Sequence, residues 1–318
     1  MINKSLFNNS SKLKRLTGLD VGQFHQLCGA IEPLWSKAEQ VRLSRPDRKR
    51  KIGAGRAYKL DNIEEKVLCL LVWLKIYPSY WFLGLMFGLD ESNILRLIKK
   101  IKPLVVQAAD RKLNRRLIGI EKRVGRKKIC SWEDLQEEFP EVAEILIDAL
   151  EQPIQRPKQV NGKRANKKQR KHYSGKKHKH TKKTQIAVNR QGTILHISKS
   201  VPGSTHDYNL LKKSKVMDKI PKQSRKILDK GYDGIKKDFP QHLNITQPIK
   251  RRRNSPPLTR KQKRHNRQVS SARILVEHVI SRVKKYSIMH ETYRNNLKQY
   301  DQDMKAVAAL VNFRLSFA

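Results

Sequence analysis

The chain has 318 residues, and its 70 Lys and Arg against 28 Asp and Glu give a formal net charge of +42 at pH 7. Such a charge excludes a typical enzyme of small neutral substrates and predicts a polyanionic partner. Nucleic acid fits better than a membrane, because no apolar run approaches the roughly 18 residues of a transmembrane helix and the first residues lack the core of a signal peptide. The three cysteines (Cys28, Cys69, Cys130) share no metal-ligand spacing, which is typical of a protein of the reducing cytosol.

Residues 1–60 are predicted to form a helical and basic N-terminal segment. One short helical pattern covers residues 21–28. The basic, glycine-containing stretch 45–56 predicts a linker or a flexible segment that contacts phosphate.

The segment 61–105 begins with an apolar helix. Asp61 and Glu64 have the spacing of a capping box. The run 67–74 is apolar enough to predict a buried helix that ends near Pro78.

Two more short helices complete this segment. The first is expected at 79–87 and stops at Gly88, and Ser92 is expected to cap the second, whose polar face is basic. A glycine-bearing turn before a basic last helix is typical of a helix-turn-helix domain, so we expect Arg96 and Lys99 to contact DNA. A generic three-helix bundle is the alternative.

A helical connector, 106–140, precedes a change to strand patterns. It closes with a capped acidic helix at 131–139. Strands are predicted at 144–150, 184–189, 193–198, 226–231 and 244–249, and helices at 207–217, 266–285 and 304–317. The order β-β-β-α-β-β-α, with a hairpin turn at 189–192, predicts an α/β fold with a mixed sheet over residues 141–318.

Two basic runs interrupt this order. Residues 156–183 contain 13 Lys and Arg, and residues 250–267 contain nine. His178 and His180 have no further metal ligands nearby, so the first run is better explained as a phosphate-binding surface loop, in which Lys176 and Lys177 would contact DNA.

Three carboxylates stand out. Asp148 lies within one apolar strand and Asp229 ends another, while Glu277 lies on a helical stretch with Arg273 and Lys284 within roughly 40° of it. Alone, the helical trio could be ordinary i,i+4 charge pairing. If the acids meet at the edge of the sheet, they offer oxygen ligands to Mg²⁺ or Mn²⁺, and two ions would suit phosphoryl transfer.

Five ordered motifs resemble bacterial insertion-sequence transposases with an Asp-Asp-Glu catalytic core of RNase H-like fold, closest to insertion-sequence family five and its Harbinger relatives. The motifs are 147–149, 173–181, 201–207, 229–232 and Arg273-x3-Glu277-x6-Lys284. The resemblance implies that Asp148, Asp229 and Glu277 bind the catalytic metal ions, and that Arg273 and Lys284 contact substrate phosphate.

The chain departs from the pattern of these transposases at two positions. Ser270 stands where related families have a tyrosine, and Leu150 replaces the usual small or hydroxylic residue after the first aspartate. Asp207, preceded by His206, is a competing metal carboxylate. Its position at a helix start favours a capping role.

The resulting hypothesis is a DNA transposase. The helix-turn-helix would bind terminal inverted repeats, and the core would cleave the 3′ end and join it to target DNA, as a homodimer in the synaptic complex, in the cytoplasm and associated with the nucleoid. The alternatives are an inactive or domesticated DNA-binding derivative, an RNase H-like structure-specific endonuclease, and a basic RNA-associated protein.

Overall fold

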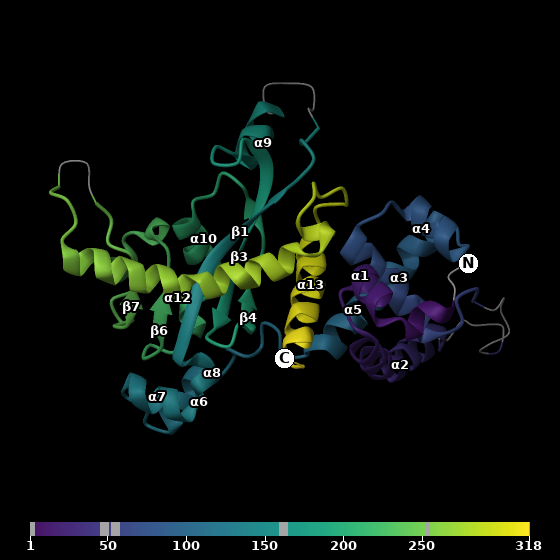
Figure 1. Ribbon diagram of the computed structural model, residues 1–318, viewed down its shortest axis with the longest axis horizontal. Helices are drawn as coiled ribbons and strands as arrows, with labels where there is room; N and C mark the ends of the chain where they lie inside the picture. Colours follow the sequence, from purple (N-terminus) through teal and green to yellow (C-terminus); the bar gives the residue numbers. More distant parts are fainter. Residues whose placement is uncertain (1–3, 45–50, 52–57, 159–164, 252–254, 318) are drawn as a thin grey trace. The chain divides into compact units, whose positions relative to one another are not determined.

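A computed structural model describes residues 4–44, 51, 58–158, 165–251 and 255–317 (Figure 1). It contains two compact units, one formed by residues 1–111, 283–290 and 302–318, the other by residues 112–282 and 291–301. Neither unit is one continuous stretch of chain. The domains expected from the sequence follow one another along the chain and do not include this interleaving. No helix in the described ranges is long and apolar enough to cross a membrane.

The regular elements in the described part of the first unit are all helices. Its elements are η1 (Lys4–Asn8), α1 (Ser10–Thr17), α2 (Val21–Leu43), α3 (Ile63–Ile76), α4 (Tyr80–Phe87), α5 (Glu91–Asp110), η4 (Ser287–Met289) and α13 (Tyr300–Leu315). Helix α3 is buried on all sides from Lys66 to Leu74 and is therefore the core of this unit, as its apolar sequence predicted.

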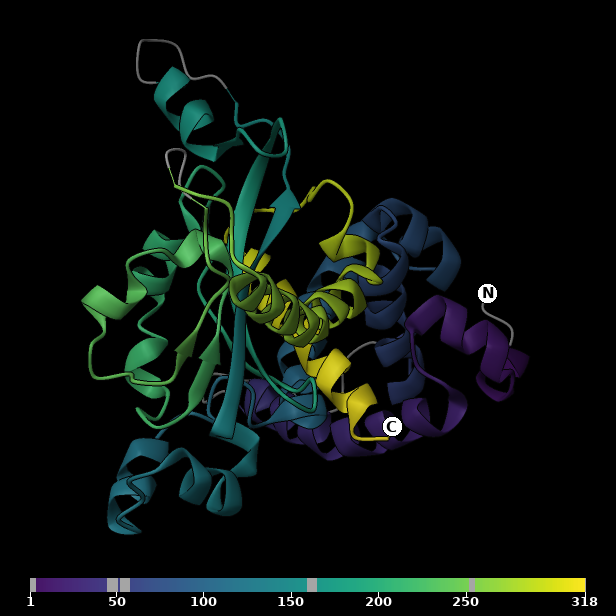
Figure 2. The same cartoon turned by 60° about the vertical axis from the view of Figure 1, so that its left-hand side comes forward.

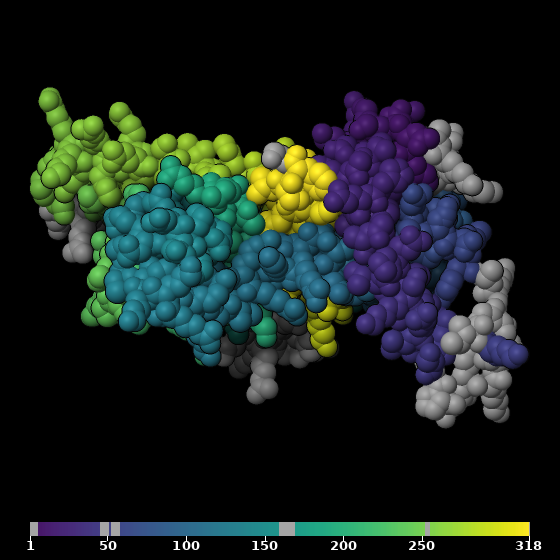
Figure 3. Space-filling view, turned by 90° about the horizontal axis from the view of Figure 1, so that it is seen from below, coloured from purple at the N-terminus to yellow at the C-terminus, as the bar shows by residue number. Residues whose placement is uncertain are grey.

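The C-terminal helix α13 completes this unit. Figure 3 shows it in yellow beside the purple N-terminal helices. Asp303 of α13 forms an ion pair with Lys102 of α5, and both residues are almost inaccessible to solvent. Asn312 adds a hydrogen bond of 2.6 Å to Asp110. Two buried polar contacts thus attach the end of the chain to α5.

Two predicted helix caps are wrong. Asn62, not Asp61, precedes α3, and it makes no side-chain capping bond. Helix α5 begins at Glu91 because the carboxylate of Asp90 accepts a hydrogen bond of 2.9 Å from the N–H of Ser92, so Ser92 lies inside the helix. In both cases the sequence places two capping-competent residues close together.

A close approach of backbone to backbone makes Gly84 indispensable to the turn between α4 and α5. A Cβ built there would lie 2.5 Å from the carbonyl oxygen of Leu89, whereas one built on Gly29, inside α2, would meet nothing within 4 Å. We expect Gly84→Ala to lower the free energy of unfolding by about 1–3 kcal/mol through overpacking. Gly29→Ala should raise it by up to about 1 kcal/mol. Urea unfolding of both variants measures this, and equal effects would contradict the close approach of Gly84 in α4 to the backbone of Leu89.

The second unit contains a mixed sheet. Its strands are β1 (Glu144–Pro153), β2 (Tyr173–Ser174), β3 (Lys179–Asn189), β4 (Ile194–Ile197), β5 (Val201–Pro202), β6 (Arg225–Ile227) and β7 (Ile245–Thr246). The order β4-β3-β1-β6-β7 runs antiparallel from β4 to β1 and parallel from β1 to β7. The predicted mixed α/β sheet and its hairpin are confirmed. The strands predicted at 226–231 and 244–249 are shorter than expected, β3 begins at Lys179 instead of residue 184, and β2 and β5 were not predicted.

Helices cover both faces of this sheet. They are α6 (Ile120–Arg126), α7 (Trp132–Glu138), α8 (Pro140–Ala143), α9 (Ala165–His172), α10 (Asp207–Ser214), α11 (Ile235–Asp238) and α12 (Arg260–Lys284), with η2 (Met217–Lys219) and η3 (Lys230–Tyr232). Ile145 and Ile147 of β1 point into a core shared with α6, α7, α8, α10 and α11. Because side chains alternate along a strand, Asp148 faces the opposite side, which α12 crosses (Figure 2).

The basic runs are more helical than expected. Part of the first forms α9, and the second leads into α12, which begins at Arg260 instead of residue 266. Lys and Arg have high helix propensity, so a charged run does not by itself indicate a loop. The expected linker at 45–56 lies outside the described residues, apart from residue 51, as do residues 159–164 and 252–254 of the two runs.

Candidate active site

The parallel pairing of β1 and β6 brings Asp148 and Asp229 together. Leu146 of β1 is in register with Ile227 of β6, and each aspartate follows its paired residue by two positions. Side chains two residues apart on a strand lie on the same face, so matched offsets on adjacent parallel strands converge at one edge of the sheet. Asp229 lies two residues after the end of β6 and directly before η3, where the chain leaves the sheet.

Arg273 of α12 lies between these two carboxylates. Its guanidinium is 3.0 Å from an Oδ of Asp229 and 3.5 Å from an Oδ of Asp148. The Arg273 side chain is only 14% exposed, so it is held at the edge of the core. The two aspartates therefore face a common point that accepts a cationic group.

The Asp148 carboxyl is in an environment that opposes ionisation. Burial raises the pKa of Asp148. The hydrogen bond of 2.8 Å from the N–H of Ala149 and the charge of Arg273 lower it, and the charges of Asp229 and Asp207 raise it further. A buried carboxylate with acidic neighbours gains most from a bound cation.

Glu277 lies on the same helix one turn after Arg273, but its side chain is exposed to solvent. Within the described ranges, no three His, Cys, Asp or Glu side chains are placed to hold one metal ion. The structure thus brings together two of the three expected metal ligands and leaves Glu277 about one helical turn along α12 from the arginine that both aspartates contact. Lys284, also expected to contact phosphate, is the last residue of α12 and is half-buried.

A buried lysine connects Asp207 to the site. Lys183 Nζ lies 2.9 Å from Asp207 Oδ1 and 3.1 Å from Glu151 Oε1, and Glu151 is directly opposite Lys183 in the β1–β3 register. The other oxygen, Asp207 Oδ2, faces Gly231, since a Cβ built on that glycine would lie 3.7 Å from it. Asp207 is therefore a third carboxylate near the Asp148–Asp229 pair.

The capping role expected for Asp207 is wrong. His206 precedes α10, and its Nδ1 accepts a hydrogen bond of 3.3 Å from the N–H of Tyr208. Neither Lys183 nor Glu151 was recognised from the sequence. Only the strand register, which places them opposite one another, could have indicated the pair.

Lys183→Met should destabilise the second unit by about 2 kcal/mol, because it leaves the mostly buried Glu151 without its partner while Asp207 can still be hydrated. Burial lowers the pKa of Lys183, but Asp207 and Glu151 outweigh burial and raise it above its ordinary 10.5. The stabilisation is therefore fully present below pH 10.5 and lost as the pH rises through the raised pKa. Urea unfolding at pH 7 and above pH 10.5, with the exposed Lys179→Met as control, measures both effects. A constant difference between Lys183→Met and wild type at both pH values would contradict this account.

The remaining DNA-binding candidates lie on exposed surfaces. Lys176 and Lys177 are in the turn between β2 and β3. Arg96 and Lys99 are exposed on α5, where Arg96 also donates a hydrogen bond of 3.1 Å to Asn93. The position of all four in solvent allows contact with phosphate.

The mixed sheet and its converging carboxylates define an enzyme of the class that acts on phosphodiesters. Residues 147–312, just over half of the chain, match the family described as DDE superfamily endonuclease, and the chain belongs to that family. It is 29% identical over 315 residues, which are 99% of this chain and 98% of the relative, to the "Probable transposase for insertion sequence element IS702" of Microchaete diplosiphon. No solved structure matches the chain significantly.

These similarities confirm the expected resemblance to insertion-sequence transposases of the Asp-Asp-Glu type and the expectation of an enzyme. The more specific placement near insertion-sequence family five stays a prediction.

Proposed function

We propose that the protein is a DNA transposase that binds the terminal inverted repeats of its element, cleaves the DNA strand at the element end and joins that end to target DNA. The observation that carries the proposal is the pair Asp148 and Asp229, brought by register to one point at a sheet edge and bridged by Arg273. Membership of the DDE endonucleases and the likeness to a probable transposase support it. Its partners are double-stranded element ends and target DNA, held by a homodimer on the nucleoid in the cytoplasm.

The donor set fits a divalent metal ion. Asp148 and Asp229 offer hard carboxylate oxygens around a point that already accepts a positive charge. They would hold Mg²⁺ or Mn²⁺, two ions in the full site, with Glu277 as the third ligand. When bound, the metal polarises the scissile phosphate and activates the attacking water or 3′-hydroxyl.

The protein's own groups then position the DNA. Arg273, released from the two aspartates, neutralises the phosphate beside the cut, and a guanidinium suits that role because it can form two parallel hydrogen bonds to phosphate oxygens. Lys183 keeps Asp207 oriented beside Gly231 and limits the negative charge around the pair. No covalent bond between protein and DNA is required.

Helices α3, α4 and α5 are proposed as the helix-turn-helix that recognises the element ends. We expect Arg96→Ala and Lys99→Ala each to weaken duplex binding and to reduce the salt dependence of log K by about one unit, the result for loss of one phosphate contact. Lys37→Ala, an exposed cation on α2, is the matched control. Fluorescence anisotropy over a salt series gives the slopes, and identical slopes for all three variants would contradict the assignment of α5.

The decisive experiment is a Mg²⁺-dependent assay on a labelled duplex containing the element end and its flanking DNA. The proposal predicts a nick at the end and a joined product with target DNA. A nick without a joined product would instead indicate a structure-specific endonuclease.

The exposure of Glu277 favours one second candidate, a DNA-binding derivative without catalysis. Such a protein would bind the element end with normal affinity and leave it intact at every Mg²⁺ or Mn²⁺ concentration.

A further inference from the structure

A cavity of about 680 Å³ lies within the helical unit, beside the proposed DNA-recognition helix α5. Its walls come from α2, the extended residues 58–60, the first turn of α3 and the N-terminal half of α5. The volume is in the range of small-ligand sites, roughly 300–1,000 Å³. Nothing in the proposed catalytic role uses this cavity.

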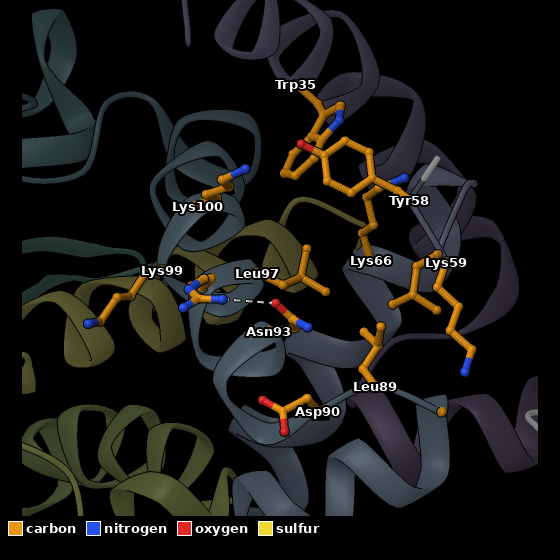
Figure 4. A pocket seen from close by; sticks show the side chains of 13 residues that line it. Trp35, Tyr58, Lys59, Lys66, Leu89, Asp90, Asn93, Leu97, Lys99 and Lys100 are labelled. Carbon is orange, nitrogen blue, oxygen red and sulfur yellow. Dashed lines mark hydrogen bonds between the residues drawn. The ribbon is translucent and has the colours of Figure 1, made fainter. Parts of the chain in front are cut away.

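Two aromatic rings form one side of the cavity. Figure 4 shows Trp35 and Tyr58 on the same side, with Lys66 and Lys100 near them. Lys100 Nζ lies 5.9 Å from the centre of the Trp35 ring and 5.6 Å from that of Tyr58, and Lys66 Nζ lies 5.5 Å from Trp35. Each ring thus has at least one lysine ammonium within cation–π distance, so aromatic surface and positive charge lie together on this wall.

Tyr58 is held in place by polar contacts at its hydroxyl. The Tyr58 hydroxyl donates to Glu39 at 2.8 Å and accepts from Arg42 at 2.6 Å. The residue is nevertheless 51% exposed. A ring fixed at its polar end and open along its face loses little entropy when it stacks on a ligand.

The charge of the cavity is strongly unbalanced. Five Lys and Arg line it against one carboxylate, Asp90, whose side chain already caps α5, and one of the five, Lys100, pairs with Glu39 at 3.3 Å. Lys66 is only 5% exposed, and its ammonium donates to the backbone carbonyls of Asp61 and Asn62. Among the described residues no carboxylate forms an ion pair with Lys66. A buried cation without an anionic partner is costly unless a ligand supplies one.

We propose that this cavity binds one unpaired nucleotide of a DNA strand, with the base on Trp35 and Tyr58 and the phosphate near Lys66 and Arg96. The aromatic wall suits the base and the cations suit the phosphate, as in other sites for single-stranded nucleic acid. A base paired within a duplex cannot enter a concave site, so the nucleotide must be unpaired. The exposed cations of α5 beside the cavity favour a DNA strand over a free nucleotide. The inference rests on the proposed binding of DNA by this unit.

The test measures the affinity of the full-length protein for two dye-labelled duplexes of the same sequence. In one, a 2-aminopurine is unpaired as a single-nucleotide bulge, and in the other it is paired with thymine. We expect the bulged duplex to bind on the order of tenfold more tightly, within the range that stacking of one base supplies. Its 2-aminopurine emission should fall on binding because the base stacks on the aromatic wall.

Three variants locate the effect. Tyr58→Leu should abolish both the preference and the loss of emission. Tyr58→Phe keeps the ring but loses the contacts of the hydroxyl with Glu39 and Arg42, so it should retain the loss of emission and a smaller preference. Trp81→Leu is the control, because Trp81 is 65% exposed on α4 and does not line the cavity. Thermal unfolding of each variant confirms that its fold is intact.

Equal affinities for the two duplexes, or equal effects of Tyr58→Leu and Tyr58→Phe, would overturn the inference. Competition by free deoxyadenosine monophosphate without any preference for the bulged duplex would overturn the assignment to DNA. Binding of the paired duplex tests the proposed function separately. If the protein does not bind the paired duplex, both the proposed function and the nucleotide site are refuted. If it binds both duplexes equally, only the nucleotide site is refuted.

Discussion

Asp229→Asn should reduce Mg²⁺-dependent cleavage of an element end on the order of a thousandfold, because it removes a charged metal ligand worth several kcal/mol in the transition state. Duplex affinity should stay within a factor of about two, since Asp229 is acidic and lies in the other unit from Arg96 and Lys99. Cleavage is measured as single-turnover nicking, and affinity by anisotropy in Ca²⁺. Asp148→Asn should have the same effect.

Asp233→Asn is the matched control, because it removes the same charge from an exposed residue four positions further along. Its nicking rate should match that of the wild type. Thermal unfolding is needed for Asp229→Asn, which also takes an ion-pair partner from Arg273. Wild-type nicking by Asp229→Asn would refute the proposed site, and loss of nicking in Asp233→Asn would show that the assay responds to net charge alone.

Asp303→Ala should lower the free energy of unfolding of the helical unit by about 3–5 kcal/mol, the usual cost of removing one partner of a buried ion pair. Asp303 is fully buried, and the ammonium of Lys102 that it neutralises also lies 5.4 Å from the centre of the Trp73 ring. The mutation leaves that cation inside the core without its anion. Urea unfolding monitored by tryptophan fluorescence measures the loss.

Lys305→Ala is the control for Asp303→Ala, because Lys305 is exposed on the same helix. It should change stability by less than about 0.5 kcal/mol. The double variant Lys102→Met, Asp303→Leu should recover much of the loss, since apolar groups of similar size often replace a buried ion pair without cost. A loss below 1 kcal/mol in Asp303→Ala would mean that water reaches the pair.

The central strands of the mixed sheet were predictable because they contain short apolar runs separated by clear turn signals. The hairpin at 189–192 and the acidic helix α7, capped by Ser131, follow from residues adjacent in sequence. Helix α2 was underestimated, since glycines and Pro33 interrupt its pattern and would ordinarily end a helix. Its full length depends on packing within the helical unit, which a local pattern does not contain.

The candidate site was predictable in part for the same reason. Asp148 and Asp229 each interrupt or end an apolar run, and that contrast identifies them without knowledge of the fold. The contact between Lys183 and Glu151 depends on which residues face each other across two strands, and the sequence alone does not fix that register. The present position of Glu277 depends on the rotation of α12 against the sheet, which the charge pattern of the helix leaves undetermined.

The place of α13 in the same unit as the N-terminal helices also determines when that unit can be completed during synthesis. Lys102 of α5 has no Asp303 to pair with until α13 has been synthesised. A ribosome-bound chain that has made only residues 1–111 therefore lacks part of the core on which α5 rests. A product truncated before α13 would therefore have an incomplete helical unit.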